Sequence, residues 1–148
     1  MRSASMQRLD GLTGTWRTTM HDAWFLEPTE QPVVGTTTIE WWHDAFVLCR
    51  WTTPGGDGAT GSAMSLALGH HDVRDAYTAL YHDERGVSRV FAMDVDDGRW
   101  TLTREDDDMF QRFVAAVAPD RITGRWQASD DGGTTWRTDF ALDLERAG

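Results

Sequence analysis

The stretch RITGRWQAS (121–129), followed by DDGGT (130–134) and TWRTDFALDL (135–144), decides the fold. Alternate positions of the first segment are apolar or small, namely Ile122, Gly124, Trp126 and Ala128. Because side chains point to opposite sides along a strand, this pattern predicts a half-buried antiparallel strand. The segment between the two strands is rich in Asp and Gly, which is typical of a hairpin turn. The whole stretch therefore predicts a β-hairpin with one buried face.

The second strand of this hairpin repeats the alternation. Its inward positions are expected to be Trp136, Phe140, Leu142 and Leu144, and its outward positions Arg137, Asp139 and Asp143. The pattern again predicts one apolar face against a core and one polar face against solvent.

Eight further segments alternate in the same way and are separated by turn-forming residues. They are 15–20, 34–43, 46–53, 63–71, 77–82, 87–94, 99–104 and 109–116. Only residues 5–12 are expected to be helical, so no segment is long enough for a helical crossover. Ten short strands with tight turns predict an all-β, up-and-down antiparallel meander. Closure into a barrel would remove its exposed edges.

Length and charge restrict the functional classes. The 148 residues suit a single domain spanning residues 1–148. The net charge of −10 repels phosphate backbones and anionic lipid surfaces, so neither nucleic acid nor membrane is an expected partner. All basic residues are Arg, and the absence of Lys excludes Schiff-base chemistry and a P-loop lysine.

The cysteine count and the terminal sequence predict a cytoplasmic protein. Cys49 is the single cysteine, so no internal disulfide can form. Residues 1–11 lack the apolar run of a signal peptide, and no stretch approaches the ~20 apolar residues that span a bilayer.

The residues also resemble a family. Gly14-Thr15-Trp16 is similar to the Gly-x-Trp opening of lipocalin-like (calycin) barrels. The stretch from Tyr81 to Phe91, together with later segments such as Gly124-Arg125-Trp126, resembles an uncharacterised family of small bacterial calycin-like proteins over residues 9–146. The resemblance implies a ten-stranded barrel with an internal cavity and no agreed activity. Nitrobindin-like relatives of this barrel shape hold haem through a late His, but no His follows His82 here. We expect no cofactor.

Strand direction alternates in a meander, so each turn can be assigned to one end of the barrel. In the calycins that the chain resembles, the end where the first strand begins is closed. The turns near residues 43–44, 70–72, 94–98 and 118–120 then belong to this end. The open end receives the connections 21–33, 54–62, 82–86, 104–108 and 129–134. It carries the two longest connections and a dense set of acidic residues, which suit either a binding region or a solvated rim.

Metal and nucleophilic chemistry are poorly supported. Four of the five His residues precede an Asp, but neighbours on a strand point apart, and the four pairs divide between the two ends. No metal site is therefore expected, because one needs three or four converging ligands. Cys49 alternates with Val47 and Trp51, which favours a buried structural thiol. The run Gly55-Gly56-Asp57-Gly58 has neither a Lys nor a following helix, so it is not a phosphate loop.

Polar residues on apolar faces are the better indication of a site. Arg89 shares a face with Val87, Phe91 and Met93, and a buried guanidinium must be paired because an isolated buried charge is very costly. Its partner is either a protein group, such as Glu40, Tyr81 or Gln111, or a ligand that carries an anionic or carbonyl group. The predicted polar anchors are Arg89, Gln111, Tyr81 and His70. The predicted apolar walls are Trp41, Trp51, Phe91, Trp100 and Trp126.

Three functions follow from these residues. The leading hypothesis is a barrel that holds a small apolar or aromatic molecule in its lumen. The alternative is a cofactor-free isomerase, cyclase or dehydratase acting on a hydrophobic metabolite, with His70 or Tyr81 as acid or base and Arg89 stabilising an oxyanion. A third possibility is a partner-binding module with a filled lumen and an exposed apolar patch.

Overall fold

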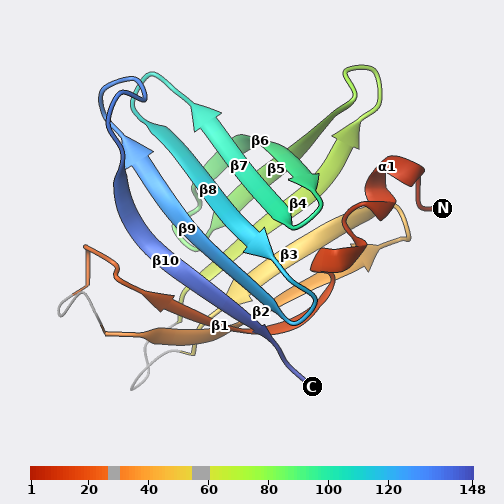
Figure 1. Cartoon of the computed structure of the whole chain (residues 1–148), viewed down its shortest axis with the longest axis horizontal. Helices are drawn as coiled ribbons and strands as arrows, with labels where there is room; N and C mark the ends of the chain where they lie inside the picture. Colours follow the sequence, from red (N-terminus) through yellow and green to blue (C-terminus); the bar gives the residue numbers. More distant parts are fainter. Residues whose placement is uncertain (27–30, 55–60) are drawn as a thin grey trace.

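Ten antiparallel strands close into a barrel, as the alternation predicts. The computed structural model describes residues 1–26, 31–54 and 61–148. The strands are β1 (Gly14–His21), β2 (Val33–Trp42), β3 (Phe46–Thr52), β4 (Ala63–His71), β5 (Ala76–Asp83), β6 (Ser88–Asp96), β7 (Arg99–Glu105), β8 (Phe110–Val117), β9 (Arg121–Ser129) and β10 (Arg137–Arg146). Each strand pairs with its neighbours in sequence, and β1 pairs with β10 to complete the barrel (Figure 1).

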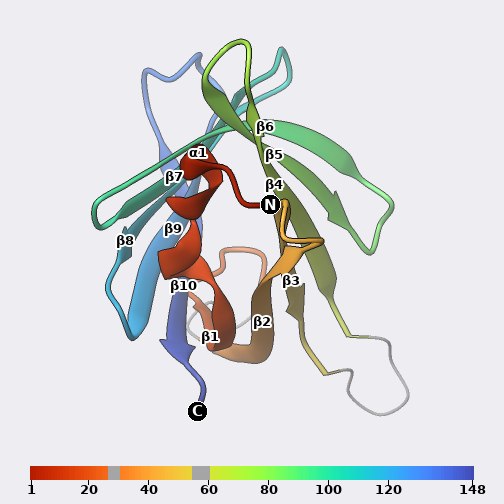
Figure 2. The same ribbon diagram turned by 90° about the vertical axis from the view of Figure 1, so that its right-hand side faces the viewer.

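The N-terminal segment lies across one end of the barrel (Figure 2). The sequence predicts one helix over residues 5–12, but the structure has α1 (Ala4–Gln7) and a separate 3-10 turn, η1 (Asp10–Leu12). Gly11 disfavours a continuous helix. The break also lets Met6, Leu9 and Leu12 all be buried against the barrel. This segment closes the end at which β1 begins, as the resemblance implies.

Trp16 and Arg146 fasten this closed end. Trp16 is fully buried, and its indole Nε1 donates to the carbonyl of Leu12, 3.0 Å away. Trp16 on β1 and Arg146 on β10 are register partners. Arg146 also donates from Nη1 to the carbonyl of Thr13 and from Nε to that of Pro119. One side chain thus joins the N-terminal segment to the β8–β9 turn.

The turns divide between the two ends as expected. The antiparallel order places the β2–β3, β4–β5, β6–β7 and β8–β9 turns at the closed end. His43 and Asp44 both have left-handed φ angles, 51° and 54°, so β2 ends at Trp42, one residue before the predicted end. The two longest open-end connections include residues 27–30 and 55–60, and the run Gly55-Gly56-Asp57-Gly58 therefore lies outside the described residues.

A bulge in β10 changes which side chains face inward. Thr138 pairs with Gln127, whereas Phe140 pairs with Trp126, so the register shifts by one residue between them. A one-residue shift reverses the faces on its far side. The predicted faces at the start of this strand are therefore wrong. Trp136 packs against the outward-facing Arg112, whose Cζ lies 3.9 Å from the ring centroid, while Arg137 and Asp139 turn inward.

Candidate functional site

The open half of the barrel encloses a cavity of about 610 Å³, and every strand contributes to its wall. This volume falls in the range of about 300–1,000 Å³ that is usual for small-molecule sites. Towards the closed end the lumen is filled by packed side chains. These include Leu68, Ala79, Ile122 and Val47, all of them fully buried. The cavity therefore lies on the side of the barrel away from α1.

Aromatic rings follow one another along the cavity wall. Trp100, near the bottom, packs edge-on against Phe113 at 5.3 Å between ring centroids, and Phe113 lies 5.2 Å from Trp126. The series continues from Trp126 to Phe140 at 6.4 Å and from Phe140 to Phe25 at 5.9 Å. It is made by residues on β7, β8, β9 and β10 and by the segment after β1. The wall thus offers an apolar, polarisable surface from the bottom of the cavity to its mouth.

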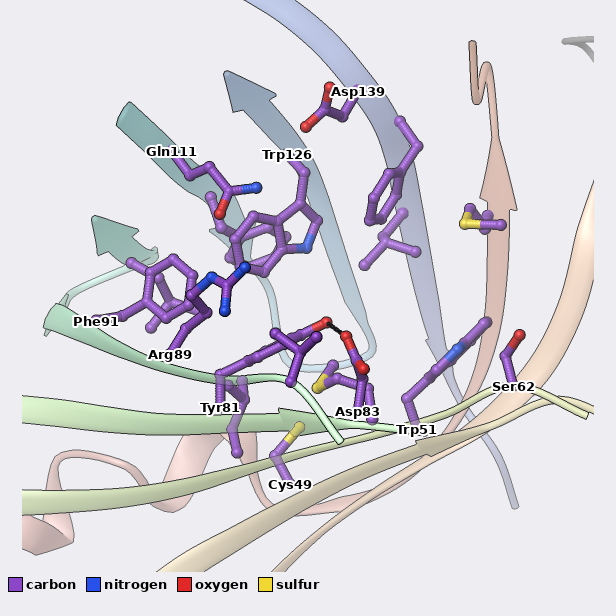
Figure 3. A pocket seen from close by; sticks show the side chains of 18 of the residues that line it. Cys49, Trp51, Ser62, Tyr81, Asp83, Arg89, Phe91, Gln111, Trp126 and Asp139 are labelled. Carbon is purple, nitrogen blue, oxygen red and sulfur yellow. Dashed lines mark hydrogen bonds between the residues drawn. The ribbon is translucent and has the colours of Figure 1, made fainter. Parts of the chain in front are cut away.

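Seven of the nine predicted site residues line this cavity, and two do not. The seven are Trp100 and six residues labelled in Figure 3, namely Trp51, Tyr81, Arg89, Phe91, Gln111 and Trp126. The other two, Trp41 and His70, share a face with cavity residues but lie at the closed end. Trp41 donates from Nε1 to Asp10 at 3.1 Å, and His70 bonds to Asp75 at 2.9 Å and packs against Tyr77.

Among the cavity arginines, Arg89 has the fewest partners in the part of the chain that the structure describes. Figure 3 shows its guanidinium directed into the cavity beside Phe91 and Trp126. Nη1 donates to the carbonyl of Ser88 at 3.0 Å, and no carboxylate in the described part of the chain forms an ion pair with it. None of the three expected partners is bound to it, because Glu40 pairs with Arg50, Tyr81 with Asp83, and Gln111 with Arg104.

The other three arginines that line the cavity are neutralised by acids of the rim. Arg85 pairs with Asp83 at 2.6 Å, and Arg137 pairs with Asp130. Arg104 pairs with Asp106 at 2.5 Å. The acidic open-end connections therefore hold the rim arginines in place.

Tyr81, Asp83 and Arg85 form a hydrogen-bonded group at the mouth. The Tyr81 hydroxyl donates to Asp83 Oδ2 at 2.7 Å, and Arg85 donates to both oxygens of the same carboxylate. These donors, Arg85 above all, hold the pKa of Asp83 well below its usual range, although the carboxylate is nearly buried. Burial and the neighbouring Asp83 carboxylate raise the pKa of Tyr81. At neutral pH the pair is thus an anion and a neutral phenol.

Arg104 is a cavity residue that the sequence analysis missed. Its side chain is 3% exposed, and Nε donates to Gln111 Oε1 at 2.5 Å. The signal was present, because Arg104 shares a strand face with Trp100 and Leu102, both inward. Arg104 orients Gln111, so the predicted anchor Gln111 already has a protein partner.

The segment after β1 contributes two exposed aromatic residues to the mouth. Trp24 and Phe25 are 62% and 51% exposed. Trp24 donates from Nε1 to the carboxylate of Asp139 at 3.1 Å, and its backbone N–H donates to the carbonyl of the same residue. Asp139 can accept these hydrogen bonds from Trp24 because the β10 bulge turns its side chain inward.

Cys49 lines the cavity as a buried thiol. Burial raises its pKa to about 12, so almost none of it is thiolate at neutral pH. This supports the structural interpretation of Cys49.

Within residues 1–26, 31–54 and 61–148, no group of three or more His, Cys, Asp or Glu side chains is arranged to hold a metal ion. No helix in the same ranges has the length and apolar character to cross a bilayer.

Comparison with known proteins supports the fold alone. No protein-family model and no curated protein matches the chain. Among solved structures, the chain is similar to Rv2717c from M. tuberculosis, with a TM-score of 0.68 and 13% sequence identity over the full length of both chains. The chain thus shares its ten-stranded barrel architecture with a bacterial protein of very different sequence.

Proposed function

We propose that this barrel binds a small, largely apolar or aromatic molecule in the open half of its lumen. The series of aromatic rings along one wall of a cavity of about 610 Å³ is the observation that carries the proposal. An aromatic wall with a few polar groups is the ordinary composition of a small-molecule site. The resemblance to calycin-like barrels implies an internal cavity but no particular activity, and a cytoplasmic location stays a prediction from the sequence.

The two rival functions find less support in this geometry. Of the two expected acid–base groups, His70 lies outside the cavity and Tyr81 already donates to Asp83. An enzymatic role would therefore need a group that the sequence did not suggest. The partner-binding module was expected to have a filled lumen, whereas the open half of this lumen is hollow.

A fluorescence titration with N-phenyl-1-naphthylamine, a neutral aromatic probe, tests the proposal. We expect saturable binding to the parent protein. Met64→Trp, which fills the cavity from β4, is expected to weaken binding at least ten-fold. Ser65→Trp is the matched control, because the next residue of the strand points outward. Circular dichroism would verify that both variants fold. Equal binding by all three proteins, or no binding by the parent, would overturn lumen binding.

A further inference from the structure

The barrel wall is split between β6 and β7 on the open-end side. These two strands pair only from Ala92↔Thr103 to Asp96↔Arg99, although β6 begins at Ser88 and β7 extends to Glu105. Each strand keeps its other neighbour over the missing part, since Ser88 pairs with His82 on β5 and Glu105 pairs with Phe110 on β8. The two strands therefore stay in the sheet and separate from each other.

A second hollow occupies this split and meets the cavity at two arginines. It is lined by Ser88, Arg89, Val90, Arg104, Asp106 and Asp108. Arg89 and Arg104 line both this hollow and the central cavity. Their side chains thus stand between the lumen and the outside of the barrel, at a place where no strand pairing closes the wall.

The two arginines differ in what they can offer a ligand. Arg104 is held by Gln111, Asp106 and Asp108, which satisfy its charge and fix its position. Within ranges 1–26, 31–54 and 61–148, Arg89 makes one hydrogen bond, to the carbonyl of Ser88. Its guanidinium has five N–H donors in a planar fork, a geometry that suits two oxygens of one anionic group. Arg89 therefore carries a positive charge at the split that no carboxylate of the described residues pairs with.

The apolar wall begins directly beside this charge. Phe91, the next inward residue on β6, packs edge-on against Trp126 at 5.4 Å between ring centroids. A molecule whose anionic group meets Arg89 can therefore lay a ring system against Phe91 and Trp126 without leaving the cavity.

From this arrangement we infer that the ligand class is an anionic aromatic molecule, held with its carboxylate or sulfonate group on Arg89 at the β6–β7 split and its rings in the lumen. The inference rests on the proposed lumen binding and adds the charge and the orientation of the ligand. The net charge of −10 repels anions at long range, so the preference arises from contact with Arg89.

A pair of probes that differ by a single group tests the ligand class. 8-Anilinonaphthalene-1-sulfonate is N-phenyl-1-naphthylamine with one added sulfonate. We expect the parent protein to bind the sulfonate at least ten-fold more tightly than the neutral probe. Arg89→Met is expected to remove this preference while retaining affinity for the neutral probe, and Arg89→Lys, which keeps the positive charge, to restore part of it.

A second pair of variants tests the position of the anionic group. Val90 is an outward residue that lines the hollow, and Leu80 is its outward register partner on β5 that does not. We expect Val90→Trp, which obstructs the hollow from outside, to reduce sulfonate affinity or its association rate at least ten-fold. Leu80→Trp is expected to behave as the parent. The naphthalene group is excited directly, so the added tryptophan does not alter the signal.

The outcomes separate the two proposals. If the parent binds neither probe, lumen binding itself is wrong. Equal affinity for both probes, or an anion preference that survives Arg89→Met, overturns the anionic class and leaves lumen binding standing. If Val90→Trp and Leu80→Trp both behave as the parent, the anionic group does not lie at the split and the inference fails.

Discussion

The guanidinium of Arg146 lies over the indole ring of Trp16, with its Cζ 4.2 Å from the ring centroid. The pair joins the first strand to the last, and Trp16 is also bonded to Leu12 below it. A cation over an indole face is attracted by the ring quadrupole, and the buried ring itself contributes a large apolar area. The closed end of the barrel therefore depends on contacts between its first strand, β1, and its last strand, β10.

Replacing Trp16 by Ala is expected to lower the free energy of unfolding by about 3–5 kcal/mol, the usual cost of deleting a buried Trp. Urea denaturation followed by circular dichroism would measure it. Trp42→Ala is the matched control, because Trp42 is 46% exposed and should cost far less. Similar losses in the two variants would mean that Trp16 does not seal the barrel.

Gly124 provides a second stability test, linked to the cavity. A Cβ on Gly124 would lie 2.5 Å from Phe113 Cε1, so the Phe113 ring would have to move. We expect Gly124→Ala to cost about 1–3 kcal/mol, as overpacked cores do. Because Phe113 lines the cavity, probe affinity should fall as well.

The control for this substitution is Gly69→Ala on β4. A Cβ there would meet nothing within 4 Å, so stability should be unchanged or slightly increased. Thermal unfolding of both variants would measure the change in stability caused by each added Cβ. A neutral Gly124→Ala would show that the ring is not packed over the β9 backbone.

Asp83 predicts a pH-dependent contribution to stability. Its pKa in the folded protein is lowered, so its stabilising effect is present above the ordinary Asp pKa of about 3.9 and is lost as pH falls through the folded value. Asp83→Asn is therefore expected to lower the melting temperature at pH 7, with the difference from the parent shrinking below about pH 4. Asp97→Asn, in the β6–β7 turn, is the control. A difference that stays constant from pH 7 to the acid limit would contradict this role for Asp83.

Cys49 is expected to react slowly with thiol reagents in the folded protein. At pH 8 a thiol with a pKa of about 12 is ionised on the order of 10³-fold less than an ordinary cysteine, and only the thiolate attacks. Colour release from an aromatic disulfide reagent would measure the rate, with the urea-unfolded chain as reference. Equal rates in the folded and unfolded states would show that the Cys49 thiol is not buried and that its pKa is not raised.

The sequence by itself determined the barrel and one face of most strands. Period-two alternation specifies which side chains point inward, and turn residues mark where the chain reverses, so both can be deduced locally. For this reason the inward placement of Arg89, Phe91 and Trp126 was predictable. The position of Trp16 at the closed end was expected instead from the resemblance of Gly14-Thr15-Trp16 to the opening of calycin barrels.

Only the tertiary structure decided the height of a residue along the barrel and the identity of its partner. Strand alternation predicts which face of the sheet a side chain occupies, but not how far along the barrel axis it lies. For this reason His70 and Trp41 share the inward face and still lie outside the cavity. The β10 bulge reversed the faces of Arg137 and Asp139, because one extra residue shifts all the side chains beyond it. The pairing of Arg104 with Gln111 and the split between β6 and β7 arise from register between strands. The Arg104–Gln111 pairing and the β6–β7 split leave Arg89 facing the cavity with no carboxylate partner among the described residues. Neither feature can be deduced from the local sequence pattern.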